Sequence, residues 1–224
     1  MLVDPADIPV YFNNFNRLTA MREMIDWLQD AGTKNIVIFD NASTYPPLME
    51  YYKNLPEGVS VNYLGQNCGP WAFWDKGFHL QQRTPYIVTD PDLIPDINCP
   101  KDLINQLQLL LHDNPSCGKV GTGLLFPGLV PPETYDPKGK SRYDENMYWT
   151  RRHSAKAFYA PIDTTFALYP VGPAKHDYGI NKNNLRMDRP YVVKHTPSFY
   201  TGIQPPEELY YIAHVNRKWS HVGW

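Results

Sequence analysis

The sequence predicts an α/β domain built on a parallel sheet that helices cover on both faces. Short apolar runs alternate with amphipathic segments through the first half of the 224-residue chain, a rhythm typical of successive βαβ units. The apolar runs are continuous, as in strands that are buried on both faces. The chain is also long enough for one substantial core, so we expect a single domain.

The first half predicts four strands with helices between them. Apolar residues recur at helical spacing between 18 and 28, behind a possible cap at Asn16. Because ligands of such sheets bind beyond the carboxyl ends of the strands, the polar residues that close the strands are expected to share one rim. The expected strands are 9–12, 35–40, 59–65 and 85–90, and the expected helices are about 18–28, 45–54 and 71–82.

The second half is less regular. A helix over 99–114 carries apolar residues on one inward face and leads to a strand over 119–126. Residues 127–150 have the composition of a long loop, with a short helix around 144–152. The remaining elements are two short strands or a hairpin within 157–170, a last strand over 191–196, and a closing helix over 205–216 with proline at its first turn.

Composition excludes several classes of function. A formal net charge of -2 gives no long-range field to attract nucleic acid or an anionic membrane. No window is long and apolar enough for a membrane span, and the first residues contain no secretory apolar stretch. Three cysteines, Cys68, Cys99 and Cys117, lack CxxC spacing and fit a reducing compartment. We therefore expect a cytoplasmic protein.

The fourth expected strand runs directly into two carboxylates, Asp90 and Asp92, held apart by Pro91. Two carboxylates this close repel each other unless a cation lies between them. Oxygen ligands suit Mg²⁺ or Mn²⁺, which then bridge to the phosphates of a ligand. Pro91 restricts the backbone and so sets the spacing before a metal arrives. The alternative is a simple Asp-Pro-Asp turn.

Polar residues also follow the first two strands. The carboxylate of Asp40 can accept the N3–H of a uracil ring, and Asn41 can bind a carbonyl of that ring or the ribose. The alternative is an Asx-turn that leads into the next helix. Asn14 and Arg17, near the start of the first helix, favour a phosphate or a base carbonyl. Asn16 is the expected cap of that helix.

Four short motifs carry a resemblance to a known family: FNR at 15–17, DNAS at 40–43, QNCG at 66–69 with DKG at 75–77, and DPD at 90–92. In this order they resemble the metal-dependent, nucleotide-sugar glycosyltransferases with the GT-A fold, especially the family 2 type. The resemblance covers the first half of the chain. It implies a GT-A (nucleotide-diphospho-sugar transferase) fold, a mostly parallel central sheet flanked by helices in a single domain. Residues 1–98 would bind the nucleotide sugar, and residues 99–224 the acceptor.

The chain departs from this family in two places. Phe73, Trp74 and Asp75 stand where the third motif normally has a small residue, Arg and Asn. The acceptor motifs of the larger processive members are absent, so processive polymer synthesis is not expected.

The resemblance also implies the chemistry and its residues. It implies Mn²⁺ or Mg²⁺ at Asp90 and Asp92, with His195 as a further ligand; the alternative is a structural histidine. An inverting transfer to a glycan hydroxyl needs a base. Asp163 is the candidate, with Asp144 and Glu145 in reserve, and the alternative for Asp163 is a strand-end aspartate bonded to a neighbouring threonine. The donor is expected to be a UDP-sugar, and its expected contacts are Asn14, Arg17, Asp40, Asn41, Asn67 and Asp90.

Two other functions stay open. A sugar nucleotidyltransferase shares the fold, but such enzymes usually carry a glycine-rich basic loop after the first strand, and NNFNRLTA at 13–20 contains no glycine. A non-catalytic nucleotide- or carbohydrate-binding module is the second alternative. The chain can also be one module of a larger glycan-assembly protein.

Overall fold

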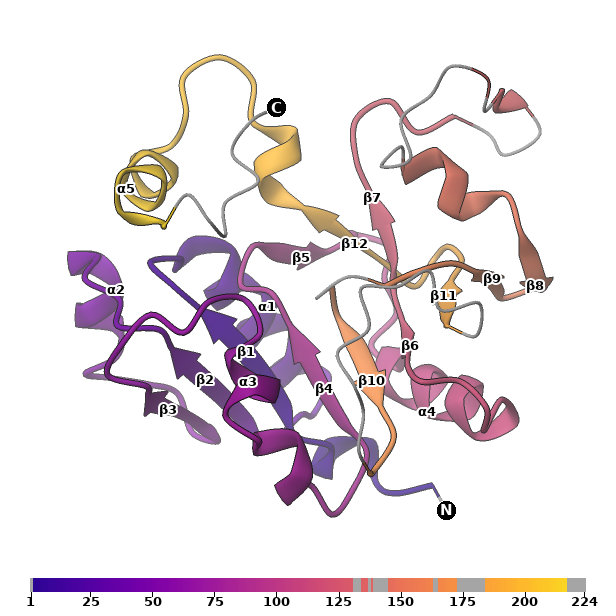
Figure 1. The fold of residues 1–224 in the computed structure, drawn as a ribbon, viewed down its shortest axis with the longest axis horizontal. Coiled ribbons are helices and arrows are strands. Elements are labelled where there is room, and N and C mark those ends of the chain that lie inside the picture. The colour runs from indigo at the N-terminus through magenta and orange to yellow at the C-terminus, as the bar shows by residue number, and fades with distance from the viewer. Residues whose placement is uncertain are drawn as a thin grey trace.

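Strands from both halves of the chain join into one large sheet in this computed structural model (Figure 1). The structure describes residues 2–130, 134–136, 138, 145–162, 165–172 and 184–216. Within these ranges the large sheet has the strand order β3-β2-β1-β4-β10-β6-β11-β9-β8. Its strands are β1 (Val10–Asn14), β2 (Ile36–Asp40), β3 (Val59–Tyr63), β4 (Tyr86–Thr89), β6 (Val120–Gly121), β8 (Arg152–Ser154), β9 (Ala157–Tyr159), β10 (Ala167–Tyr169) and β11 (Leu185–Met187).

The sheet is parallel in the first half of the chain and mixed in the second. β3, β2, β1 and β4 run parallel to their neighbours, as predicted. β10 is antiparallel to both β4 and β6, and β9 is antiparallel to both β8 and β11. The prediction of a mostly parallel sheet therefore describes the first half of the chain only.

One predicted strand region of the second half agrees with expectation and another differs. Residues 157–170 contain two short strands, as the first of the two predicted alternatives, and these pair with other strands instead of forming a hairpin. The run 119–126 is interrupted at Thr122, and β7 (Gly123–Leu125) joins a second sheet with β5 (Leu93–Pro95) and β12 (Val192–His195). Packing is very close at this departure, since a Cβ on Gly123 would lie 2.6 Å from the carbonyl oxygen of Met187.

Helices cover both faces of the large sheet (Figure 1). Apolar residues of α1 (Thr19–Asp30) and α4 (Leu103–Asp113) share one buried cluster with alternate residues of β1 and β2. Phe73 and Trp74 of α3 (Ala72–Asp75) pack on the other face. No helix in the described part of the chain combines the length and the apolar character needed to cross a membrane. The other helices are α2 (Pro46–Tyr51), α5 (Pro206–His214) and the short 3₁₀ helices η1 (Pro5–Asp7), η2 (Phe78–Gln81), η4 (Glu145–Trp149) and η5 (Thr196–Phe199).

Two of the expected helices are shorter than predicted. The helix expected over 71–82 is divided into α3 and η2, because Gly77 between them has φ 75°, a left-handed conformation that ends a helix. The helix expected around 144–152 is the 3₁₀ helix η4.

The small sheet holds the segment after β4 against the end of β12. Leu93 of β5 pairs with His195 of β12. The next residue, Thr196, donates from its backbone N and from its Oγ1 to the carbonyl oxygen of Asp92, at 2.9 and 3.0 Å. The Asp-Pro-Asp segment and His195 therefore lie side by side, although about half of the chain separates them in sequence.

Candidate functional site

Side-chain amides tie together the loops that follow β1, β2 and β3. Asn41 Nδ2 donates to Asn13 Oδ1 at 2.8 Å, and Asn41 Oδ1 accepts from the backbone N of Cys68 at 3.0 Å. Asn13 Nδ2 donates in turn to the carbonyl oxygen of Gly69 at 3.2 Å, and Asn67 Oδ1 accepts from Gly69 N at 2.9 Å. The structure thus brings the predicted polar strand ends together at one rim. The side-chain amides hold the loops in place. Their predicted contacts to a nucleotide sugar stay predictions.

Asp40 is buried in this rim with both oxygens hydrogen-bonded. Its side chain is 2% exposed; Oδ1 accepts from Ser43 N at 2.9 Å and Oδ2 from the Tyr52 hydroxyl at 3.0 Å. Burial, and then the charge of Asp40, raise the pKa of the Tyr52 phenol, which therefore stays protonated and can donate. Asn14 Nδ2 donates to the same phenol oxygen at 2.9 Å. This geometry favours the turn alternative for Asp40, and a contact between Asp40 and a base stays a prediction.

Helix α1 begins without a cap from its own residues. Leu18 occupies the N-cap position and makes no side-chain cap bond. The expectation that Asn16 caps this helix was wrong, because Asn16 Oδ1 accepts from the backbone N of Thr44 at 2.7 Å and so holds the loop before α2. The backbone N atoms of Leu18 and Thr19 both donate to Glu207 Oε2 at 3.0 Å. A carboxylate of α5 therefore satisfies the free amides at the start of α1.

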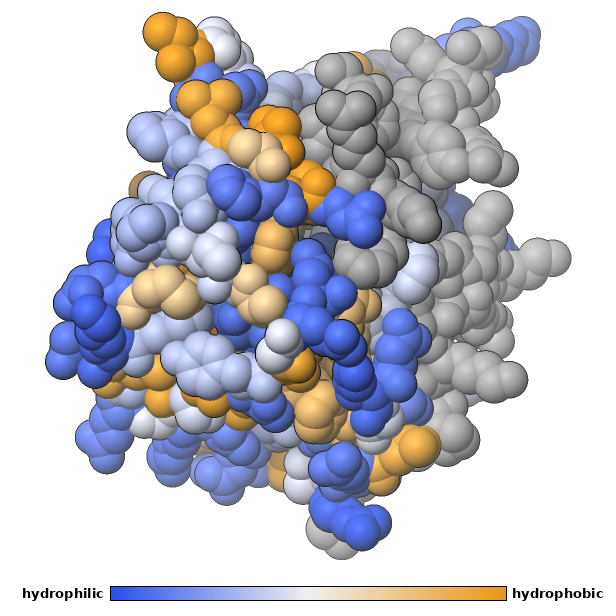
Figure 2. All heavy atoms as spheres, turned by 60° about the vertical axis from the view of Figure 1, so that its left-hand side comes forward, coloured by the Kyte–Doolittle hydropathy of each residue, from blue (hydrophilic) through white to orange (hydrophobic). Residues whose placement is uncertain are grey.

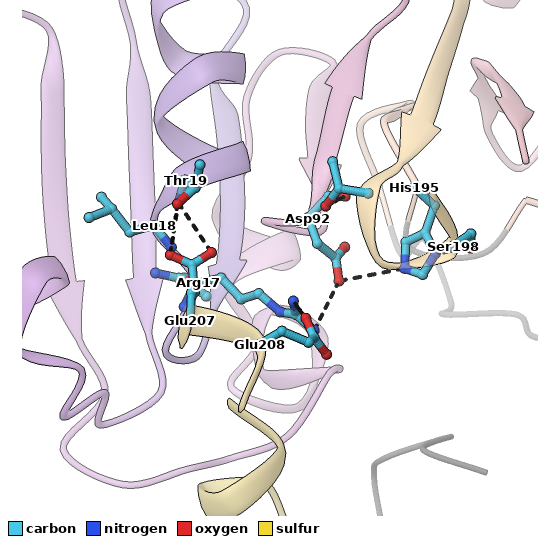
Figure 3. A network of polar contacts seen from close by, with 10 residues as sticks. Arg17, Leu18, Thr19, Asp92, His195, Ser198, Glu207 and Glu208 are labelled. Atoms are coloured by element: carbon cyan, nitrogen blue, oxygen red, sulfur yellow. Dashed lines mark hydrogen bonds and ion pairs between the residues drawn. The ribbon is translucent and has the colours of Figure 1, made fainter. Parts of the chain in front are cut away.

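The neighbouring carboxylate of α5, Glu208, binds Arg17, which was predicted to contact the nucleotide sugar (Figure 3). Glu208 accepts from both terminal nitrogens of this guanidinium, Nη2 to Oε1 at 3.2 Å and Nη1 to Oε2 more closely. Arg17 Cζ also lies 3.9 Å from the centre of the Tyr211 ring. Burial lowers the pKa of Arg17, but Asp92 and Glu208 raise it by more, so the side chain stays charged. Sequence reasoning missed these partners, because the segment 205–216 indicates only a closing helix with proline at its first turn.

Asp92, Arg17 and His195 form a charged cluster between the two sheets (Figure 3). Asp92 Oδ2 lies 3.7 Å from Arg17 Nη2 and 3.5 Å from His195 Nε2. Burial raises the pKa of Asp92, but His195 and Arg17 lower it by more, and the result is a carboxylate with a pKa well below its usual range. Burial lowers the pKa of His195, and Asp92 raises it above its ordinary value. Two of the predicted metal ligands, Asp92 and His195, therefore meet in the fold.

The chemistry of these groups suits a divalent cation that also binds phosphate. Ligands of one such ion lie roughly 3 Å apart, close to the separation of Asp92 Oδ2 and His195 Nε2. His195 Nδ1 is 2.8 Å from Ser198 Oγ, a contact that orients the ring and leaves Nε2 toward Asp92. The described residues contain no group of three or more His, Cys, Asp or Glu side chains that could together hold a metal ion. Mg²⁺ commonly takes only one or two protein carboxylates and completes its shell with water and substrate phosphates.

The remaining site predictions fall on Asp90 and on the candidate bases. Burial raises the pKa of Tyr211, and the charges of Asp92 and Asp90 add to that rise; Asp90 also adds to the effect of Asp92 on the pKa of His195. Asp163 and Asp144 lie outside the described residues. Glu145, the other reserve base, is paired with Arg186 at 2.5 Å. That contact gives Glu145 a structural partner of opposite charge.

No protein-family model and no curated protein matches the sequence. Among solved structures, the chain is similar to the mannosyltransferase PcManGT from Pyrobaculum calidifontis, determined with GDP-Man and Mn²⁺, at 18% identity and a TM-score of 0.42. This match covers 58% of the present chain and 38% of that one. Residues 1–349 of S. aureus TarS match at 12% identity and a TM-score of 0.48, over 85% of this chain and 60% of that chain.

HddC from Yersinia pseudotuberculosis, complexed with GMP-PN, matches at 9% identity and a TM-score of 0.37, over 53% of this chain and 58% of that chain. The present chain thus spans less than two thirds of each of these three structures. By its own geometry it is an α/β protein with a polar rim at the carboxyl ends of parallel strands, beside a cluster of one carboxylate, one arginine and one histidine. The functional argument below depends on that site.

Proposed function

We propose that this chain is a glycosyltransferase domain that transfers a sugar from a nucleoside diphosphate sugar, with UDP as the nucleotide, to a hydroxyl of a glycan acceptor. The observation that carries the proposal is the meeting of Asp92 with His195 and Arg17 at the strand-end rim. The order of the four motifs, FNR, DNAS, QNCG and DPD, supports it from the sequence.

Asp92 and His195, with Asp90 beside them, would hold a Mn²⁺ or Mg²⁺ ion. Once bound, such an ion offsets the charge that develops on the departing diphosphate. His195 and Arg17 hold the pKa of Asp92 well below its usual range, so this carboxylate is ionised at neutral pH. Ser198 holds the His195 ring from the other side, which reduces the ordering cost of binding.

Arg17 would bind the phosphates directly. Its planar guanidinium donates two parallel hydrogen bonds to a phosphate or carboxylate, as it does here to Glu208. The ring of Tyr211 lies against it and restricts its position. Arg17 and the cation would thus bind the diphosphate from two sides.

Asp163 is the proposed base, on the sequence argument alone. In an inverting reaction the acceptor oxygen bonds to the anomeric carbon as the bond from that carbon to the diphosphate breaks. The acceptor hydroxyl loses its proton to a carboxylate in the same step. Asp163 precedes the buried strand β10, so it lies in the half of the chain that we assign to the acceptor.

The test is hydrolysis or transfer with a panel of nucleotide sugars, led by UDP-glucose, with Mn²⁺ and with a chelator. A glycosyltransferase releases the nucleoside diphosphate in the presence of the metal, and the chelator abolishes the release. The second candidate, a non-catalytic binding module, is favoured by the lack of a three-ligand cluster among the described residues. Such a module would bind the nucleotide or the glycan with no turnover of any donor, and that result would contradict the proposal.

A further inference from the structure

Helix α5 faces the protein with its charged side. Glu207 and Glu208 are 8% and 6% exposed, whereas Leu209 and Ile212 are 54% and 40% exposed. Figure 2, which brings the α5 side of the molecule forward, shows hydrophobic residues in the upper part of the surface, where Figure 1 draws the loop before α5 and, below it, α5. Within the described residues, no side chain of α5 belongs to a hydrophobic cluster of the core. This is the reverse of an ordinary surface helix, which buries its apolar face.

Polar and aromatic contacts attach α5 to the rest of the chain at its first turn and along its middle, where Tyr211 lies against Arg17 and Phe15. At the first turn, Glu207 bonds to the start of α1 and Glu208 to Arg17. At the middle, the Tyr210 hydroxyl donates to the carbonyl oxygen of Thr44 at 3.1 Å and its ring lies 5.1 Å from that of Tyr45. These contacts are charged and aromatic rather than apolar core packing, so an anionic ligand that binds the same donors competes with them directly. Elements that move to admit ligands come from such weakly held segments.

The two carboxylates of α5 occupy the groups that an anionic ligand would use. Glu208 takes both terminal nitrogens of Arg17, and Glu207 takes the free amides at the start of α1. With Asp90 and Asp92 close by, acidic groups outnumber basic ones around Arg17. A diphosphate that approached this arrangement would meet like charge and would find its donors already bonded.

We propose that α5 is an autoinhibitory acidic plug, residues 206–214, which a ligand of the diphosphate class must displace from Arg17 and the start of α1 before it can bind. The inference rests on the proposed function in one respect: that function identifies the diphosphate as part of a nucleotide sugar. The plugged form binds no diphosphate. The apparent affinity of the protein is therefore the affinity of the open form multiplied by the fraction of molecules that are open. Removing the acidic contacts therefore tightens binding.

Titration calorimetry with inorganic pyrophosphate compares three proteins: wild type, the double variant Glu207→Gln/Glu208→Gln, and the control Glu23→Gln/Glu57→Gln. Both residues of the control are exposed, and it removes two carboxylates, as the first variant does. We expect pyrophosphate to bind about tenfold more tightly to the first variant than to wild type, and the control to stay within about twofold of wild type. Equal affinities, or weaker binding to the first variant, would overturn the plug.

A second variant keeps both carboxylates and so covers the case in which the double variant does not fold. Tyr210→Phe removes the hydroxyl that bonds to Thr44, and Tyr63→Phe is the matched control on an exposed tyrosine. We expect Tyr210→Phe, and not Tyr63→Phe, to bind pyrophosphate a few-fold more tightly. Hydrogen exchange gives the direct readout: pyrophosphate should accelerate exchange of the α5 amides in the wild type. Unchanged or slower exchange there rejects displacement.

These measurements separate the two proposals, because pyrophosphate contains neither base nor sugar. If pyrophosphate displaces α5 and no nucleotide sugar is turned over, the plug holds and the proposed function fails. If donors are turned over while α5 exchange never responds to a diphosphate, the function holds and the plug fails.

Discussion

Asp40 ends the central strand β2 and Asp92 follows the central strand β4, and the structure surrounds the two carboxylates in opposite ways. Asp40 is bonded at 2.9 and 3.0 Å to two neutral donors, Ser43 N and the Tyr52 hydroxyl. Asp92 has charged neighbours, Arg17 and His195, at 3.7 and 3.5 Å, beyond the usual length of a hydrogen bond. The short bonds of Asp40 to neutral groups are those expected of a residue in a turn. The ion pairs of Asp92 are longer than hydrogen bonds and leave its carboxylate able to bind a further ion.

The largest expected effect separates the two residues by activity. Asp92→Asn should lower metal-dependent donor turnover by about a thousandfold and leave the fold intact. Arg17 keeps Glu208 and His195 keeps Ser198 when the charge of Asp92 is removed. Donor turnover measured with Mn²⁺ checks the loss of activity, and a thermal melt checks that the fold is intact. The control is Asp96→Asn, which removes a carboxylate of the same segment that pairs with Lys194 at 3.0 Å; turnover by Asp92→Asn equal to that of this control would exclude the metal role.

Asp40→Ala should act on stability instead. It leaves a buried phenol and a backbone amide without their acceptor, which costs about 3 kcal/mol of unfolding free energy. Urea unfolding measures this loss, with exposed Asp75→Ala as the control. A variant that kept its stability and its pyrophosphate binding but lost UDP binding would assign Asp40 to the base and break the contrast.

A smaller effect is expected at the histidine that faces Asp92. Ser198→Ala removes the group that orients His195 through Nδ1, and should weaken Mn²⁺ binding about tenfold. Calorimetric titration with Mn²⁺ alone measures the change, and Ser60→Ala, an exposed serine of β3, is the control. Identical Mn²⁺ affinities in both variants would mean that Ser198 does not position His195 for a metal.

The smallest effect concerns the partner of Asp40. Tyr52→Phe removes one hydrogen bond to Asp40 and the acceptor of Asn14 Nδ2, and should lower the unfolding free energy by about 1 kcal/mol. The same urea titration detects it, with exposed Tyr63→Phe as the comparison. Stability that did not change would show that water replaces the phenol, and the rim around Asp40 would then be open to a ligand.

Local pattern was enough to predict the first half of the chain. Its four parallel strands and α1 follow from apolar runs and from helical spacing, which depend on neighbours in sequence. The rim of strand ends follows as well, because parallel strands place their carboxyl ends along one edge. The chemical types at that rim, amides and carboxylates, were also readable from the motifs.

Only the tertiary structure decided how those groups are used. Asn16 and Asp40 could each cap, turn or bind, and the choice depends on partners such as Thr44 and Tyr52 that spacing does not reveal. Antiparallel β10, the break at Thr122 and the pairing of β12 with β5 bring distant segments together through long-range strand contacts. Glu207 and Glu208 reach α1 and Arg17 from almost the other end of the chain. Sequence determined which elements form, because their periodicity is local, while folding determined which charges meet, because electrostatic contact depends on distance in space.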